Sequence, residues 1–232
     1  MNTEIARFNM IEQQIRPWQV LDPAVLDLLA MVRREDFVPL QHRSMAFVDT
    51  QVPLLGADAA GTAAQGSNDA CMLEPKVEAR LLQALQVQRH ESVLEIGTGS
   101  GFMAALLAHR AQGVITLECR PQLAQMARAS LQRNGIFNAR VVDVSAAEGA
   151  RGRVADAPFD VILLSGSVPE VPGALLQQLK PGGRLAAEVG EEPVMRARLY
   201  TRVGAAAWSQ TDLFDTVAPR LQGFDEPSRF HF

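Results

Sequence analysis

Apolar residues in the first part of the chain recur at the spacing of helices. Ile5, Phe8, Ile11 and Ile15 follow one another at intervals of three or four residues, and Pro17 ends the pattern. A second helix is predicted to begin at an Asp-Pro pair, because the aspartate caps it and the proline lacks an N–H that would be unpaired there anyway. Its buried side is formed by Val25, Leu26, Leu28, Leu29 and Val32.

The stretch from Gln51 to Ala70 breaks this pattern. Between Gly56 and Asn68 it holds mostly small and polar residues, which bury too little apolar area to order a segment. We therefore predict a mobile surface loop near 51–70. This loop is either a plain connector or a lid over a substrate site, since long loops in compact domains often have a function.

From Lys76 onward, predicted strands alternate with predicted helices. The strands are expected at 92–96, 114–117, 139–142, 159–164 and 184–189, and the helices at 77–85, 102–109, 121–133 and 172–179. This alternation predicts an α/β, doubly wound, mostly parallel Rossmann-like sheet with helices on both faces. Residues 196–203 and 208–214 predict a C-terminal antiparallel hairpin. We expect one compact unit, with an N-terminal helical, substrate-side segment at 1–75 and a ligand-binding domain at 76–232.

A glycine-rich run follows the first predicted strand of that domain. Its spacing is G-x-G-x-G, whereas a dinucleotide fold uses G-x-G-x-x-G and places a pyrophosphate on the helix N-terminus. A glutamate two residues before the first glycine would repel a pyrophosphate but favour a cation. S-adenosylmethionine carries a sulfonium and an ammonium and no phosphate, so this run favours S-adenosylmethionine over a nicotinamide cofactor. The predicted contacts are Glu95, Gly97, Thr98, Gly99 and Gly101.

A second acid supports the first. Glu118 ends the next predicted strand, 23 residues beyond Glu95. An acid at about this offset accepts hydrogen bonds from the ribose hydroxyls of a bound nucleoside. The alternative is a solvated charge at the end of a strand.

Composition excludes several classes of protein. The net charge of −4 and the isoelectric point near 5.6 argue against binding nucleic acid through phosphate neutralisation. Two cysteines far apart, and histidines without metal-ligand spacing, predict no metal site and a reduced, cytoplasmic protein. We find no signal peptide at the N-terminus and no run of about 18 apolar residues, so we expect no membrane span.

At these residues the chain resembles the protein-L-isoaspartate O-methyltransferase family. The resemblance extends roughly from Met10 to Gly190 and includes the glycine-rich run. Its other segments are Met10–Pro17, Val32–Pro39, Phe159–Ile162, Val168–Pro172 and Leu175–Leu185. The resemblance implies S-adenosylmethionine-dependent methyl transfer to a carboxylate of isoaspartyl residues in damaged proteins, with S-adenosylhomocysteine as the product. It also implies a protein or peptide substrate and leaves the oligomeric state open.

The resemblance implies a third cofactor contact. The family has Gly-Asp-Gly about a dozen residues before its Phe-Asp pair, and the matching positions here are Ala147, Glu148 and Gly149. Glu148 would then accept a hydrogen bond from the adenine amino group. Another register uses Asp143 for this contact, and Glu148 is then a surface charge.

The chain departs from the family on the substrate side. The family has a Thr-Ile-Ser-x-Pro segment whose serine lies beside the transferred methyl group and the substrate carboxylate. The matching residues here run from Cys71 to Pro75, and Leu73 occupies the serine position. Leucine donates no hydrogen bond, so we assign no catalytic residue, and isoaspartyl specificity is in question.

Three alternatives therefore stay open. The first is a methyltransferase of the same fold with another substrate, and the second is a non-catalytic protein that binds S-adenosylmethionine. The third is an NAD-linked reductase, which the glycine spacing disfavours.

A substrate carboxylate has a pKa of about 4 and is ionised at neutral pH, so its methylation needs no general base. Ser165 and Ser167, beyond a predicted strand, are expected near the cleft, where they either touch substrate or cofactor or belong to an ordinary loop.

Overall fold

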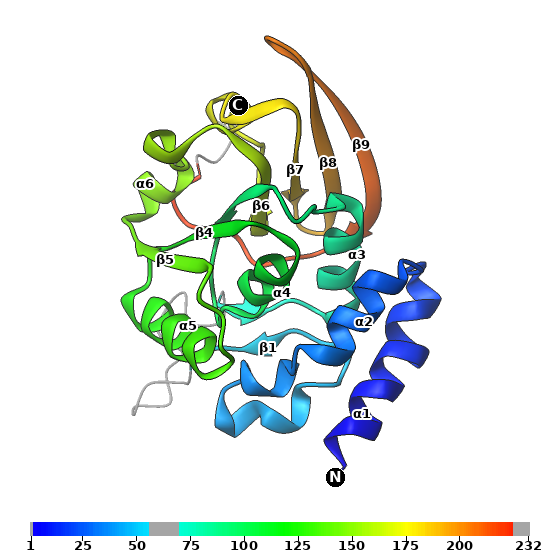
Figure 1. The fold of residues 1–232 in the computed structure, drawn as a ribbon. Coiled ribbons are helices and arrows are strands. Elements are labelled where there is room, and N and C mark those ends of the chain that lie inside the picture. The colour runs from blue at the N-terminus through cyan, green and yellow to red at the C-terminus, as the bar shows by residue number, and fades with distance from the viewer. Residues whose placement is uncertain (1, 56–69, 225–232) are drawn as a thin grey trace, which may run out of the picture.

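The computed structural model describes residues 2–55 and 70–224, and a seven-stranded sheet forms its centre (Figure 1). The strand order is β5-β4-β3-β6-β7-β8-β9, with parallel pairing from β5 to β7 and antiparallel pairing from β7 to β9. The strands are β3 (Ser92–Ile96), β4 (Gly113–Glu118), β5 (Ala139–Asp143), β6 (Phe159–Val168), β7 (Leu179–Glu191), β8 (Val194–Gly204) and β9 (Ala207–Thr216). The predicted fold class is confirmed, including the C-terminal antiparallel hairpin.

Helices cover both faces of this sheet (Figure 1). One hydrophobic cluster joins one face to α3 (Pro75–Leu85), α4 (Phe102–Arg110) and α5 (Pro121–Arg133). A second cluster joins the other face to α6 (Ala146–Ala150) and α7 (Gly173–Leu176), next to a 3-10 turn, η6 (Val154–Asp156). The predicted helix at 172–179 is therefore too long. The chain leaves α7 early because Leu179, fully buried, already pairs with Phe159 in the sheet.

The strand order reverses at β3, which has β4 on one side and β6 on the other. Apart from half-buried Ser92, every residue of β3 is buried, as expected for a central strand covered on both faces. In such sheets ligands bind beyond the carboxyl ends of the strands at the point of reversal. The glycine-rich run begins at this point, directly after Ile96.

The N-terminal residues form short helices that pack against α3 and α4 as part of the first hydrophobic cluster. Within α1 and the π-helical turn after it, the buried apolar residues are Met10, Ile11 and Ile15, whereas Ile5 and Phe8 are 58% and 62% exposed. The helical elements are α1 (Thr3–Met10), η1 (Ile11–Ile15), η2 (Arg16–Trp18), α2 (Pro23–Met31), η3 (Arg34–Asp36) and η4 (Leu40–Met45). The proposed division at residue 75 stays a prediction.

A two-stranded ribbon stands at the two ends of the predicted loop at 51–70. Strand β1 (Val52–Pro53) pairs antiparallel with β2 (Cys71–Met72), while residues 56–69 lie outside the described part of the chain. The ribbon leads directly into Leu73 and α3. Within the described ranges, no helix has the length and apolar character needed to cross a bilayer.

Candidate active site

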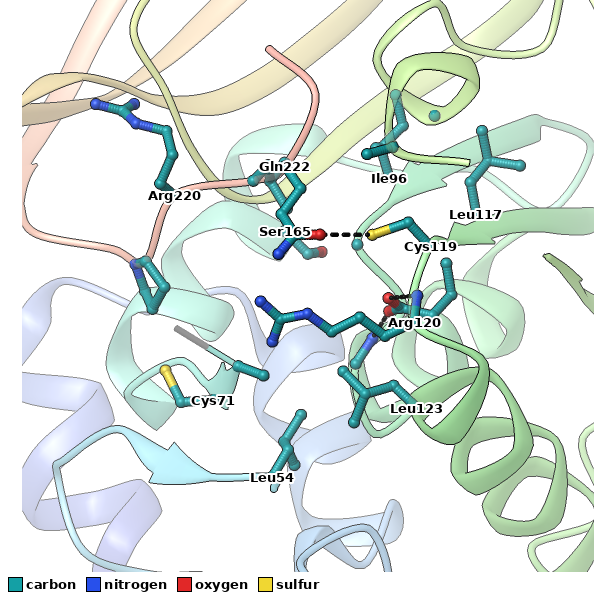
Figure 2. A pocket seen from close by; sticks show the side chains of 18 of the residues that line it. Leu54, Cys71, Ile96, Leu117, Cys119, Arg120, Leu123, Ser165, Arg220 and Gln222 are labelled. Carbon is teal, nitrogen blue, oxygen red and sulfur yellow. Dashed lines mark hydrogen bonds between the residues drawn. The ribbon is translucent and has the colours of Figure 1, made fainter. Parts of the chain in front are cut away.

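A cleft of about 680 Å³ opens at the carboxyl ends of β3 and β4 (Figure 2). We call it the main cleft; its walls come from the glycine-rich run, the end of β4, the β2 ribbon and a C-terminal segment at 217–224. That segment is held by two backbone hydrogen bonds, from Ser167 N to Pro219 O (2.7 Å) and from Leu221 N to Ser167 O (2.9 Å).

The first two glycines of the run form the floor of the main cleft. Gly97 and Gly99 have φ angles of +93° and +54°, which disfavour side chains. A Cβ on Gly97 would lie 2.7 Å from Leu221 Cδ2, and one on Gly99 would lie 3.1 Å from Leu54 Cδ1. Both positions therefore need glycine, and both leave backbone open to a ligand.

Gly101, the third glycine of the run, lies against α5. It does not line the cleft, and a Cβ at this position would lie 3.2 Å from Ala127 Cβ. It therefore permits close packing of α4 on α5, as the third glycine does in nucleotide-binding folds. Its direct contact with a cofactor stays a prediction.

Glu118 lies at the cleft, where the sequence places it. Its side chain is largely buried, and its two carboxylate oxygens accept hydrogen bonds from Gly99 N (2.9 Å) and Arg120 N (3.0 Å). A carboxylate has about four acceptor positions, so these two bonds orient it and leave capacity for two hydroxyl donors. This is the arrangement that a ribose diol requires.

Glu95 is fully buried beneath the glycine-rich run. It accepts hydrogen bonds from Thr116 Oγ1 (2.7 Å) and Ser165 Oγ (2.8 Å), and Thr116 in turn contacts Thr98 Oγ1 at 2.6 Å. Burial raises the pKa of Glu95 to about 8, against which the two hydroxyl bonds act. Burial therefore disfavours the ionised form of this carboxyl, and an approaching cation would favour it.

Glu148 is exposed and does not reach the cleft. Its carboxylate accepts hydrogen bonds from Ser145 N (2.8 Å) and Ser145 Oγ (2.7 Å), which closes a capping box at the start of α6. These bonds lower the pKa of Glu148. Gly149 does line the cleft, whereas the alternative acid, Asp143, is exposed and pairs with Arg128. The adenine contact of Glu148 stays a prediction that this conformation does not support.

Comparison with known proteins agrees with this geometry. The family model for protein-L-isoaspartate(D-aspartate) O-methyltransferase matches residues 6–217. The chain belongs to this family. A protein-L-isoaspartate O-methyltransferase of Koribacter versatilis is 36% identical over 210 residues, which cover 90% of this chain and 87% of that protein. One from Myxococcus xanthus is 40% identical over 171 residues, 74% of each chain.

Solved structures agree on the fold. A Plasmodium falciparum protein of the same family name, in complex with S-adenosyl-L-homocysteine, superposes with a TM-score of 0.73. The aligned region covers 96% of this chain and 99% of that one at 18% identity. Family membership makes the chain an S-adenosylmethionine-dependent methyltransferase.

In this methyltransferase a smaller space of about 380 Å³ lies behind the glycine-rich run. We call it the inner compartment; Glu78, Glu95 and Phe102 line it. Buried Arg34 pairs with Glu78, donates to Leu73 O (2.7 Å) and stacks over the Phe102 ring at 5.0 Å. Burial raises the pKa of Glu78 to about 7 although the Arg34 charge opposes this. Arg34 thereby fixes the wall that carries Leu73.

Sequence reasoning missed several cleft residues of this methyltransferase. Cys119, Arg120, Leu221 and Gln222 all line the main cleft, and Cys119 Sγ donates to Gln222 Oε1 across 3.5 Å. Figure 2 shows the Arg120 side chain extending from the end of β4 into the cleft. Cys119 and Arg120 directly follow Glu118, the predicted ribose acid, so their position next to it could have indicated them. Leu221 and Gln222 are distant in sequence, and no local pattern predicts their place in the cleft.

Proposed function

We propose that this chain transfers the methyl group of S-adenosylmethionine to the carboxylate of isoaspartyl residues in proteins and peptides. The observation that carries the proposal is Glu118, held by two backbone amides beside the glycine floor in a chain of this family. The product would be S-adenosyl-L-homocysteine. The proposed cofactor contacts are Glu95, Gly97, Thr98, Gly99, Glu118 and Gly149, with Gly101 supporting the loop.

The residues fit the cofactor by their chemistry. Glu118 suits the ribose hydroxyls, and the absent side chains of Gly97 and Gly99 leave room for the ligand against the backbone. When bound, S-adenosylmethionine supplies an activated methyl carbon. The chain contributes alignment and a site that excludes water, which are the main demands of a direct displacement. No side chain has to remove a proton, because a carboxylate acceptor is already ionised.

A second candidate is methylation of another acceptor in the same cleft. Leu73 favours it, because this residue is 6% exposed, lines both spaces and offers no hydrogen bond where the family resemblance places a serine. The change removes one contact to a carboxylate without affecting the adenosyl side. Different acceptors would then be expected with the same cofactor.

Methyl labelling separates these candidates. The experiment offers labelled S-adenosylmethionine with an isoaspartyl peptide and with its aspartyl twin, and measures base-labile methyl ester. We expect label on the isoaspartyl peptide alone. Equal labelling, or none while S-adenosylhomocysteine still binds, would contradict isoaspartyl activity and favour the second candidate.

The cellular location is part of the same proposal. Neither Cys71 nor Cys119 forms a disulfide in the described residues, which fits a protein kept reduced in the cytoplasm.

A further inference from the structure

Several carboxyl groups surround the two spaces of the active site. Glu118 lines the main cleft, and Glu78 and Glu95 line the inner compartment. An isoaspartyl acceptor brings a further carboxylate to this site. A carboxylate that leaves water for a partly enclosed cleft needs an opposite charge and hydrogen-bond donors in return. The described residues should therefore include a cation that can meet the acceptor.

Two cationic side chains line these spaces in the described part of the chain, Arg120 and Arg220, and both belong to the main cleft. Arg220 is turned toward β7, where its Nη2 donates to Gly190 O (2.8 Å). The guanidinium of Arg34 is fully buried behind the wall and pairs with Glu78. Arg120 is therefore the cation best placed for an acceptor that enters the main cleft.

The Arg120 side chain begins at the ribose side of the main cleft and extends across it. Its backbone amide donates to the Glu118 carboxylate (3.0 Å), which fixes the start of this half-buried side chain. Figure 2 shows the side chain leaving the end of β4 and running toward the side of the cleft on which Cys71 lies. Cys71 belongs to β2, and Leu73 follows two residues later. The guanidinium thus extends toward the wall on which Leu73 offers no donor.

Arginine suits a carboxylate that has to react. Its planar guanidinium keeps its charge and carries several N–H donors. Donation to one carboxylate oxygen leaves the other oxygen to form a bond to the methyl carbon, while the bond from that carbon to the cofactor sulfur breaks. The sulfonium becomes a neutral thioether, the carboxylate becomes a neutral ester, and no proton moves. The guanidinium therefore attracts the substrate and loses its charged partner in the product.

We propose that the Arg120 guanidinium binds the acceptor carboxylate, in place of the hydroxyl that the family resemblance places at Leu73. Arg120 is then a specificity-determining residue that favours the ionised acceptor over the esterified product. This inference rests on the proposed carboxyl methylation and names the residue that recognises its acceptor.

The test compares Arg120→Gln with Arg89→Gln as the matched control. Arg89 is exposed, precedes the amino end of β3 and lines neither space, so its replacement makes the same change of net charge away from the cleft. Titration calorimetry with S-adenosylhomocysteine present measures the affinity for the isoaspartyl peptide and for its methyl ester. Wild type and Arg89→Gln should bind the acid about tenfold more tightly than the ester, whereas Arg120→Gln should bind both about equally.

Two further measurements make the result specific. In Arg120→Gln the KM for the isoaspartyl peptide should rise about tenfold, while the affinity for S-adenosylhomocysteine stays within about threefold of wild type. Arg120→Lys keeps the positive charge and should recover part of the preference for the acid over the ester.

The outcomes are distinct for the inference and for the function beneath it. A preference for the acid that is unchanged in Arg120→Gln, or absent from the wild type, would overturn the role of Arg120 alone. An equal loss of affinity for acid and ester, or a parallel loss of S-adenosylhomocysteine affinity, would overturn it as well, because a structural or cofactor-binding role predicts these results. A wild-type protein that neither binds nor methylates the isoaspartyl peptide would overturn the proposed function and the inference together.

Discussion

Glu188 provides a test of the fold that is independent of catalysis. It lies in β7, is fully buried, and neither of its carboxylate oxygens has a hydrogen-bond partner within the described residues. Burial raises its pKa to about 8, and the nearby carboxylates of Glu74 and Glu78 add to this effect. Replacement by glutamine keeps the size of the side chain and removes its ionisation.

The size of the effect follows from the two pKa values of Glu188. Below about pH 4.5 the folded and unfolded chains both hold the proton. As the pH rises towards 8 only the unfolded chain releases it, so stability falls. The full loss is on the order of 5 kcal/mol, of which about 2–3 kcal/mol develops between pH 6 and pH 9. The other buried acids remain in both proteins and cancel in the comparison.

Urea unfolding of wild type and Glu188→Gln at pH 6 and pH 9 measures this term. We expect the advantage of the variant to grow by about 2–3 kcal/mol from the lower to the higher pH. Glu170→Gln, at an exposed position, should show no such growth. A stability difference between Glu188→Gln and wild type that is the same at both pH values would refute the reasoning.

Three further predictions concern the cofactor site. Glu118→Ala should weaken S-adenosylhomocysteine binding about tenfold or more by calorimetry, because the carboxylate that accepts hydrogen bonds from the ribose hydroxyls is lost. Glu148→Gln should leave this affinity unchanged if Glu148 only caps α6. Affinity for S-adenosylmethionine should rise with pH and level off above about pH 8, because the bound cation favours the ionised form of Glu95. The Glu95→Gln variant should show a flatter dependence of affinity on pH. A wild-type affinity that does not change with pH would contradict this role of Glu95. Gly97→Ala should abolish ligand-induced thermal stabilisation, because φ at this position is +93° and the new Cβ would lie 3.2 Å from the Ser165 carbonyl oxygen. Gly173→Ala, with no atom within 4 Å of its Cβ, should retain the stabilisation.

The sheet and the cofactor-side acids could be predicted because residues close together in the sequence carry the signals for both. The glycine spacing placed the turn, and the strand after it placed Glu118 at the same edge of the sheet. Ser145 and Glu148 also form the S-x-x-E signature of a capping box, so the cap at α6 was readable from the sequence. The family resemblance instead predicted that Glu148 accepts a hydrogen bond from the adenine amino group.

Tertiary contacts were not predictable in this way. Gly101 looked like part of the ligand loop, and only the position of Ala127 on α5 shows its packing role. Leu221 and Gln222 reach the cleft because the chain after β9 returns along the end of β6, which no periodicity encodes. The burial of Glu95, and hence its raised pKa, likewise depends on the helices that cover the sheet.

A crystal structure with S-adenosylhomocysteine tests the central claim most directly. We expect the ribose hydroxyls on the Glu118 carboxylate and the ligand backbone lying against Gly97 and Gly99. A well-ordered cleft that stays empty at saturating ligand, or that binds a pyrophosphate on this turn, would contradict the account.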